Sequence, residues 1–173
     1  MQSLQLSDVK DFMGKLLTTE LFDAFFVSEA SITTFTTFRI DGTFHPDYYG
    51  STAETDNNSP SPRFLTWRLL RPHFFDIVKG RYTPLEFKLI FRLADHNVEK
   101  LLLQTGVSFR PEDVAGLFLN IHYREKSLTC TTGTSLHLFT LDHSLDYAWD
   151  EMVQKFLRQG RIPFEQPSFV STH

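Results

Sequence analysis

The sequence has little cysteine, no long apolar run and no excess of basic residues. Its 173 residues include one cysteine, Cys130, so the chain can form neither an internal disulfide nor a cysteine-based zinc cluster. No segment approaches the roughly 20 apolar residues that a membrane-spanning helix needs. Residues 1–6 lack the basic and apolar regions of a signal peptide. These absences predict a cytoplasmic protein with no membrane partner.

The sequence also lacks the short motifs of several enzyme classes. It contains no P-loop, no GxGxxG, no GxSxG nucleophile and no HExxH. The local pairs His45 with Asp47 and His73 with Asp76 each supply too few ligands for a metal site. We therefore predict no metal and no cofactor, and we favour a protein that is not an enzyme. An enzyme whose site is assembled from distant residues, near His45, Asp47 and His73, is the alternative.

Phenylalanine is the most unusual component of the sequence. Apolar residues make up 41% of the chain and charged residues 22%, which is ordinary for a globular protein, but there are 18 Phe residues. Each buried aromatic side chain removes about 150–250 Å² from water. The chain is long enough for one domain, so we predict a single domain with a thick aromatic core.

Apolar periodicity predicts an α+β fold. Helices are predicted where apolar residues recur at helical spacing: residues 8–18 with Ser7 as N-cap, 64–79 with an interruption at Pro72, 95–105 capped by Asp95, and 144–159. Strands are predicted where β-branched, aromatic and alternating apolar residues cluster: 4–6, 21–30, 31–40, 43–45, 87–93, 117–123, 128–132 and 136–141.

Turn signals separate these predicted strands. We expect a turn near 29–31, and Asp41-Gly42 is a strong hairpin signal. Residues 50–62 contain no large aliphatic or aromatic side chain and predict a mobile surface loop. The tail from Pro163 is expected to be loose.

One order of elements occurs twice along the chain. A strand, a helix and three strands span about 4–45, and the same order spans about 87–142. The helices align Val9 with Val98 and Met13 with Leu102. Two such units can cover each other's open faces. We predict two βαβββ-like units that form one domain, and chance recurrence of a common pattern is the competing explanation.

Paired βαβββ units resemble the domains of DNA sliding clamps, over roughly 4–45 and 87–142. Four segments of the second unit carry most of the resemblance: Phe87–Leu93, Val98–Leu102, Gly116–Ile121 and Ser127–Thr134. The resemblance implies a clamp-like fold. A clamp's DNA channel is lined by basic helix faces, whereas acidic residues accompany the lysines of both predicted helices, so we do not transfer the clamp function. The whole chain also resembles an uncharacterised bacterial family.

One basic segment lies inside the acidic chain. The net charge is −4, but residues 63–92 contain seven basic and two acidic residues, a net charge of +5. The candidates for contacting nucleic acid or an acidic partner combine cations with an aromatic residue: Arg63, Trp67, Arg68, Arg71, Lys79 and Arg81. Core packing of Trp67 and ion pairing of the arginines is the alternative. The same surface could dock a protein partner or a second copy of the chain. We predict a binding or assembly module.

Overall fold

The computed structural model describes residues 1–52 and 64–167, which fold as an α+β domain. The helices are α1 (Val9–Thr18), α2 (Trp67–Val78), α3 (Asp95–Thr105) and α4 (Ser144–Gln159), with short 3-10 helices η1 (Pro46–Thr52) and η2 (Pro111–Asp113). The strands are β1 (Ser3–Leu6), β2 (Phe26–Thr33), β3 (Thr37–Ile40), β4 (Glu86–Arg92), β5 (Val114–Arg124), β6 (Ser127–Leu136) and β7 (Phe164–Glu165). No helix in these ranges is long and apolar enough to cross a membrane.

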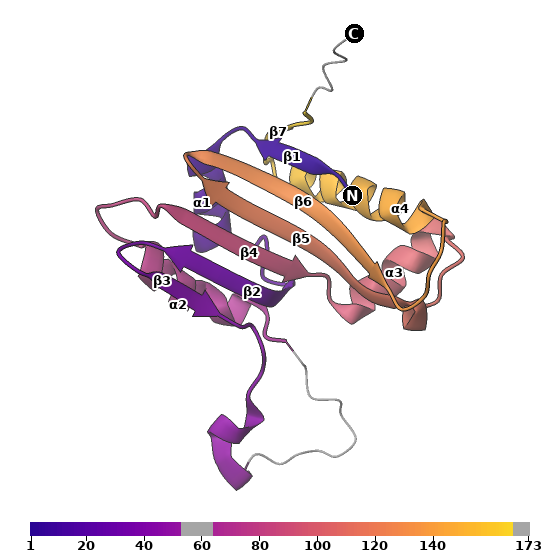
Figure 1. Ribbon diagram of the computed structural model, residues 1–173, viewed down its shortest axis with the longest axis horizontal. Helices are drawn as coiled ribbons and strands as arrows, with labels where there is room; N and C mark the ends of the chain where they lie inside the picture. The colour runs from indigo at the N-terminus through magenta and orange to yellow at the C-terminus, as the bar shows by residue number, and fades with distance from the viewer. Residues whose placement is uncertain (53–63, 168–173) are drawn as a thin grey trace.

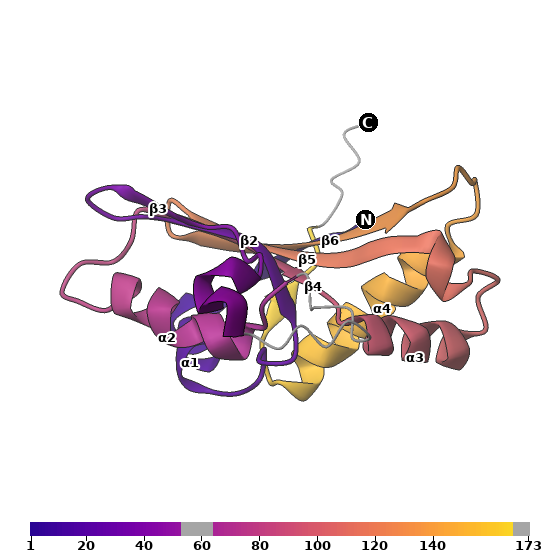
Figure 2. The ribbon, with the colours of Figure 1, turned by 90° about the horizontal axis from the view of Figure 1, so that it is seen from below.

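The strands of the described residues form one antiparallel sheet. Their order is β3-β2-β4-β5-β6-β1-β7 (Figure 1). All four α-helices lie against one face of the sheet, and the other face is open (Figure 2). Antiparallel sheets accept this arrangement because alternate side chains can point toward solvent.

The core lies between the sheet and its helices and is rich in aromatic rings. Phe87, Leu89 and Phe91 alternate along β4 and are fully buried. Phe22 stacks on Phe91 with ring centroids 5.4 Å apart, and Trp67 meets Phe91 edge-on at 5.4 Å. The predicted aromatic core is thus located where β4 meets α2 and the segment before β2.

The predicted helices are present, with differences at their ends and one in the middle. The helix predicted from residue 64 begins at Trp67, because Phe64 and Thr66 form β-bridges with Thr43 and Phe26. Asp8, rather than Ser7, caps α1, because its carboxylate accepts the backbone N–H of Asp11 at 3.0 Å. Ala94 precedes α3, so Asp95 is its first helical residue and not its cap. The interruption at Pro72 was wrong, because α2 continues through it. Burial of Trp67 on one side of Pro72 and Phe74 on the other outweighs the one lost backbone hydrogen bond.

The turn predicted near 29–31 was wrong, because β2 runs unbroken to Thr33. Ala30 and Ser31 have backbone partners in both β3 and β4, and Glu29 pairs with Ile90 of β4, which holds this segment extended. The Asp41-Gly42 hairpin and the strand after it were also wrong, since Thr43 forms only an isolated bridge. Gly42 has φ 66°, and a Cβ there would lie 2.0 Å from the carbonyl oxygen of Val27. Glycine is needed because the chain crosses close to β2.

The C-terminal half differs from prediction at the end of β6 and in the C-terminal tail. This strand is continuous through Gly133, which pairs with Phe118, and the strand predicted for 136–141 is absent. The tail expected to be loose includes β7, which pairs with β1. Of the loop predicted for 50–62, residues 50–52 end η1 and the remainder lies outside the described residues.

The predicted βαβββ order is found in neither unit, and the two units are arranged differently in the sheet. Each unit contains a strand, a helix and two further strands, one strand fewer than predicted. In the second unit, β4 lies beside β5. In the first unit, β1 and β2 are separated by β4, β5 and β6. The strands of the two units therefore have different neighbours within the shared sheet.

Candidate functional site

Five of the six residues predicted to bind nucleic acid or an acidic partner are described by the structure, and they are not brought together. Trp67 is 1% exposed, and its indole N–H donates to the carbonyl of Leu16 at 3.0 Å. Arg71 donates two hydrogen bonds to Asp23, from Nε at 3.0 Å and from Nη2 at 2.9 Å. Both side chains fasten α2 to the rest of the domain and are not available to a partner. Arg63 lies outside the described residues.

The other three candidates are exposed but do not form one cluster. Arg68 lies on the first turn of α2, whereas Lys79 and Arg81 follow its last turn. Arg68 and Lys79 are eleven positions apart along the chain, which corresponds to about 16 Å of helix. Lys79 pairs with Asp76 at 2.9 Å, and the Arg81 guanidinium lies 5.9 Å from the centre of the Tyr82 ring. The exposed basic charge is therefore concentrated after the helix, in the connection to β4.

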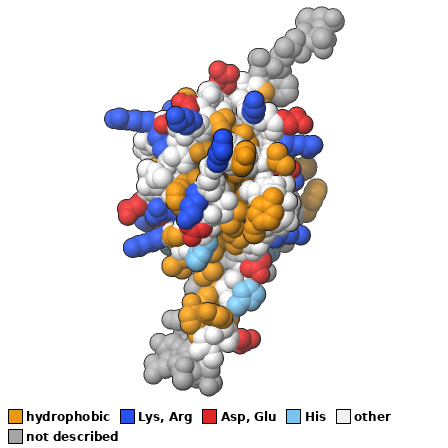
Figure 3. Space-filling view, turned by 90° about the vertical axis from the view of Figure 1, so that its left-hand side faces the viewer, with side chains coloured by type: hydrophobic (Ala, Val, Ile, Leu, Met, Phe, Trp, Pro, Cys, Tyr) orange, Lys and Arg blue, Asp and Glu red, His pale blue; other side chains and the backbone are white. Residues whose placement is uncertain are grey.

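Three chain connections meet at this end of the sheet. Strand register places them together, because Glu86 pairs with both Thr33 and Arg124, and Arg124 pairs with Ser127. We call this region the aromatic–basic end, and it consists of residues 34–36, 79–85 and 124–127. Figure 3 faces it and shows hydrophobic side chains in the centre with Lys and Arg side chains around them.

Large apolar side chains are exposed at the aromatic–basic end. Phe35 is 92% exposed, Tyr82 81% and Leu85 69%. They surround a hollow of about 540 Å³, whose lining also includes Ile77, Lys79 and Arg81. Exposed apolar groups gathered around a concave surface are typical of interaction sites.

Local backbone structure explains why these side chains are not buried. Gly80 has φ 143°, a conformation that L side chains rarely adopt, and it turns the chain away from α2 before Tyr82. The backbone N–H of Leu85 then donates to the carbonyl of Thr33 at 2.9 Å, which fixes the connection against the end of β2. Phe35 lies in the β2–β3 turn, and the Phe38 ring meets its ring edge-on, with centroids 6.0 Å apart.

The charge of the aromatic–basic end differs from that of the whole chain. It contains four basic residues, Lys79, Arg81, Arg124 and Lys126, and one acidic residue, Glu125, which give a net charge of +3. The full chain has a net charge of −4. The apolar hollow therefore has a positively charged rim, which favours a ligand surface that combines apolar groups with carboxylates.

The residues of the alternative enzyme site do not converge. His45 Nε2 lies 3.0 Å from Asp41 Oδ2, and both side chains are 67% exposed. Asp47 and His73 are exposed on η1 and α2, respectively. The hydrogen bond from the Thr43 backbone, and then that from His45, holds the pKa of Asp41 below its usual range. Asp41 is thus a poor candidate for a general acid.

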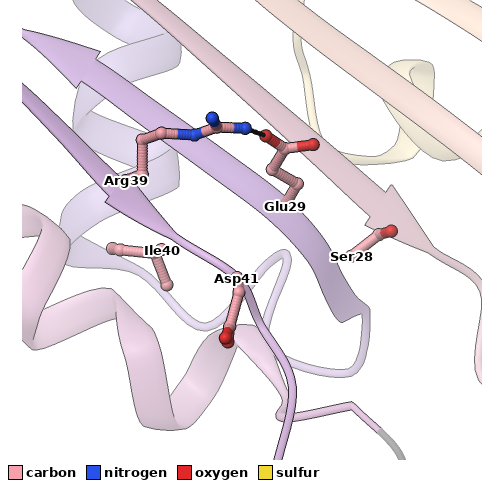
Figure 4. A pocket seen from close by; sticks show the side chains of 5 residues that line it. All are labelled: Ser28, Glu29, Arg39, Ile40 and Asp41. Carbon is pink, nitrogen blue, oxygen red and sulfur yellow. Dashed lines mark hydrogen bonds and ion pairs between the residues drawn. The ribbon is translucent and has the colours of Figure 1, made fainter.

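A pocket of about 540 Å³ beside Asp41 contains none of the three predicted enzyme residues. Its polar lining includes Glu29 and Arg39, which pair with each other, while Asp41 points away from them (Figure 4). Within residues 1–52 and 64–167, no group of three His, Cys, Asp or Glu side chains could hold a metal ion. Burial raises the pKa of the Cys130 thiol to about 12, so Cys130 is not an activated nucleophile.

The residues predicted from the sequence include Lys79 and Arg81 but not Phe35, Tyr82 or Leu85. A signal for Tyr82 and Leu85 was present, because Gly80 and Pro84 interrupt helical and strand periodicity around them. Phe35 carried no such signal, since it was assigned to a strand. Its exposure follows from the position of the β2–β3 turn.

Comparison with known proteins identifies one family. A family model described as "Family of unknown function (DUF5721)" matches residues 15–165. No curated protein and no solved structure matches the chain.

Proposed function

The chain belongs to the DUF5721 family, whose function is unknown, and we propose that it is a non-enzymatic protein-binding module. The aromatic–basic end is the docking surface of this module. Its hollow receives apolar side chains of the partner, and Lys79, Arg81 and Lys126 face carboxylates around them. This proposal develops the binding or assembly role that the charge distribution of the sequence predicts.

The observation that carries the proposal is the exposure of Phe35, Tyr82 and Leu85 around one hollow. Single exposed apolar residues are common on protein surfaces, but here three large ones line the same concave region. Aromatic side chains with a nearby arginine are also the residues that contribute most to protein–protein binding energy. Covering these groups with a partner removes their apolar surface from water.

A protein partner fits this end better than nucleic acid does. The aromatic residue predicted to stack on bases, Trp67, is buried, and Arg71 is paired with Asp23. Binding to a phosphate backbone depends on several cations that displace counterions. The resemblance to sliding clamps predicted from the sequence adds no support for DNA binding, because α1 and α3 carry acidic residues as well as lysines.

Site-specific photo-crosslinking in the cells that produce the protein tests the proposal. A benzophenone amino acid replaces Tyr82, and in a control chain it replaces Lys10 on α1, which is exposed and lies outside this end. We expect discrete protein adducts from position 82 that resist nuclease and are absent from position 10. Adducts that disappear with nuclease would identify nucleic acid as the ligand. Equal labelling at both positions would show that the aromatic–basic end is not a docking surface.

A further inference from the structure

The connection between β6 and α4 exposes large apolar side chains at the opposite end of the sheet. Phe139 is 92% exposed and Leu141 81%, and Leu138 beside them is 42% exposed. Asp142 follows directly, and its carboxylate accepts the backbone N–H of Ser144 at 2.9 Å. This hydrogen bond lowers the pKa of Asp142. The 138–142 loop therefore presents apolar side chains next to a carboxylate that is ionised at neutral pH.

The surroundings of this loop are acidic. We call the region formed by α3, residues 106–113 and residues 137–143 the acidic end. It contains five acidic residues, Asp95, Glu99, Glu112, Asp113 and Asp142, and two basic residues, Lys100 and Arg110. Its net charge is −3, opposite to the +3 of the aromatic–basic end. The two ends thus complement each other in charge, and both expose large apolar groups.

The two ends of one molecule cannot meet. Leu136 pairs with Val114 at the acidic end, and Ser127 pairs with Arg124 at the aromatic–basic end. The 11 residues of β5 connect the two ends, and an extended strand of that length spans about 34 Å. In Figures 1 and 2 the β6–α4 connection and the α2–β4 connection likewise lie at opposite ends of the sheet. Complementarity between them can act only between separate molecules.

Building on the proposed function, we propose that the docked partner is a second copy of this chain. The 138–142 loop of one molecule enters the hollow of the next, with Phe139 against Tyr82 and Asp142 facing Lys79 and Arg81. The contact joins two different surfaces, so every bound pair retains one free loop and one free hollow. Such head-to-tail contacts continue into an open chain, or into a ring where the rotation closes.

Sedimentation velocity of the purified full-length protein tests this arrangement with two blocking variants. Tyr82→Asp blocks the hollow and Phe139→Asp blocks the loop, and both side chains are too exposed to be needed for folding. We expect the unmodified chain to form larger species as concentration rises, and fewer of them at high salt. Each variant alone should associate at least about 30-fold more weakly, which is the effect of losing a central aromatic residue from an interface. Tyr48→Asp, at an 86% exposed tyrosine on η1, is the matched control and should associate like the unmodified chain.

Mixing the two variants gives the decisive result. Tyr82→Asp retains its loop and Phe139→Asp retains its hollow, so an equimolar mixture should form a species with the mass of two chains and nothing larger. A contact of hollow with hollow, or of loop with loop, would leave one variant dimeric on its own and would overturn the head-to-tail arrangement. A chain that stays monomeric at all concentrations would also overturn it. In that case, protein adducts at position 82 in cells would still support the proposed function, with a different partner.

Discussion

Trp67 and Tyr82 lie at opposite ends of the same helix, one in the core and the other on the surface. Trp67 opens α2, where it is buried beneath α1 and touches Phe74 and Phe91. Tyr82 follows α2, where it is 81% exposed beside the hollow of the aromatic–basic end. Both are aromatic residues with arginines next to them in the sequence. The same local composition therefore contributes to the core at one end of the helix and to the surface at the other.

The difference arises from what lies opposite each segment. The start of α2 faces α1 and the segment before β2, which supply a carbonyl for the Trp67 indole and a carboxylate for Arg71. The connection after α2 extends past the end of the sheet, where the structure places no element over Tyr82 among the described residues. An exposed aromatic residue is thus informative only when its three-dimensional surroundings are known.

The largest effect that separates the two regions should come from Trp67→Ala. The substitution removes a fully buried indole and its hydrogen bond, so we expect the free energy of unfolding to fall by about 3–5 kcal/mol. Urea denaturation followed by circular dichroism measures this change. A loss below about 1 kcal/mol would mean that Trp67 is not a core residue.

A smaller effect is expected from Arg71→Ala, with Arg68→Ala as its matched control on the same helix. The Arg71 and Asp23 side chains are 20% and 12% exposed, and the substitution leaves the Asp23 carboxylate without its bidentate partner. We expect a loss of about 1–3 kcal/mol in the free energy of unfolding. The exposed Arg68 should change it by less than about 0.5 kcal/mol. Equal losses for the two variants would contradict the conclusion that Arg71 stabilises the fold and Arg68 does not.

The next effect concerns Asp146 on α4, next to the acidic end, and depends on pH. Burial raises the pKa of Asp146. The hydrogen bonds with Thr134 and His143 together lower this pKa by more than burial raises it, so the net shift is downward. A folded-state pKa below the unfolded value of about 3.9 stabilises the fold above that pH, and the stabilisation is lost as pH falls through the folded pKa. Thr134→Val should therefore reduce stability by about 1 kcal/mol at pH 7. In urea titrations the difference should shrink below about pH 4, and an equal difference at pH 7 and pH 3 would contradict the assignment.

The smallest effect on stability is expected at the aromatic–basic end itself. Phe35→Ala and Tyr82→Ala remove side chains that are 92% and 81% exposed, so the free energy of unfolding should change by less than about 0.5 kcal/mol. Thermal unfolding of the two variants beside Trp67→Ala measures this contrast. Losses above about 2 kcal/mol would place these side chains in the fold rather than on a docking surface.

Helical periodicity and composition were sufficient to predict much of the fold. The stripe of Leu145, Trp149 and Val153 marks α4, whose observed bounds agree with the prediction, because only a buried face imposes such regular spacing. The turn before β3 was misplaced, because β2 is rich in strand-forming residues on both sides of the predicted turn. The length of β2 depends on its pairing with β4, which follows much later in the chain.

The candidate site was less predictable than the fold. The charge pattern located Lys79 and Arg81, but the hollow requires the β2–β3 turn, the α2–β4 connection and the start of β4 to meet. The periodicity of the sequence does not predict that these three segments lie together, because their proximity depends on the order of the strands in the sheet. The same limit applies to the complementarity of the two ends, which lie at opposite ends of β5.

Carbodiimide cross-linking of an equal mixture of unlabelled and ¹⁵N-labelled protein tests the docking of one end on the other most directly. The reagent joins lysine amines to carboxylates in contact, and peptides of mixed isotope identify links between molecules. We expect mixed-isotope links from Lys79 or Lys126 to Asp142, Glu99 or Glu112. Links confined to single molecules, or mixed links that avoid both ends, would contradict it.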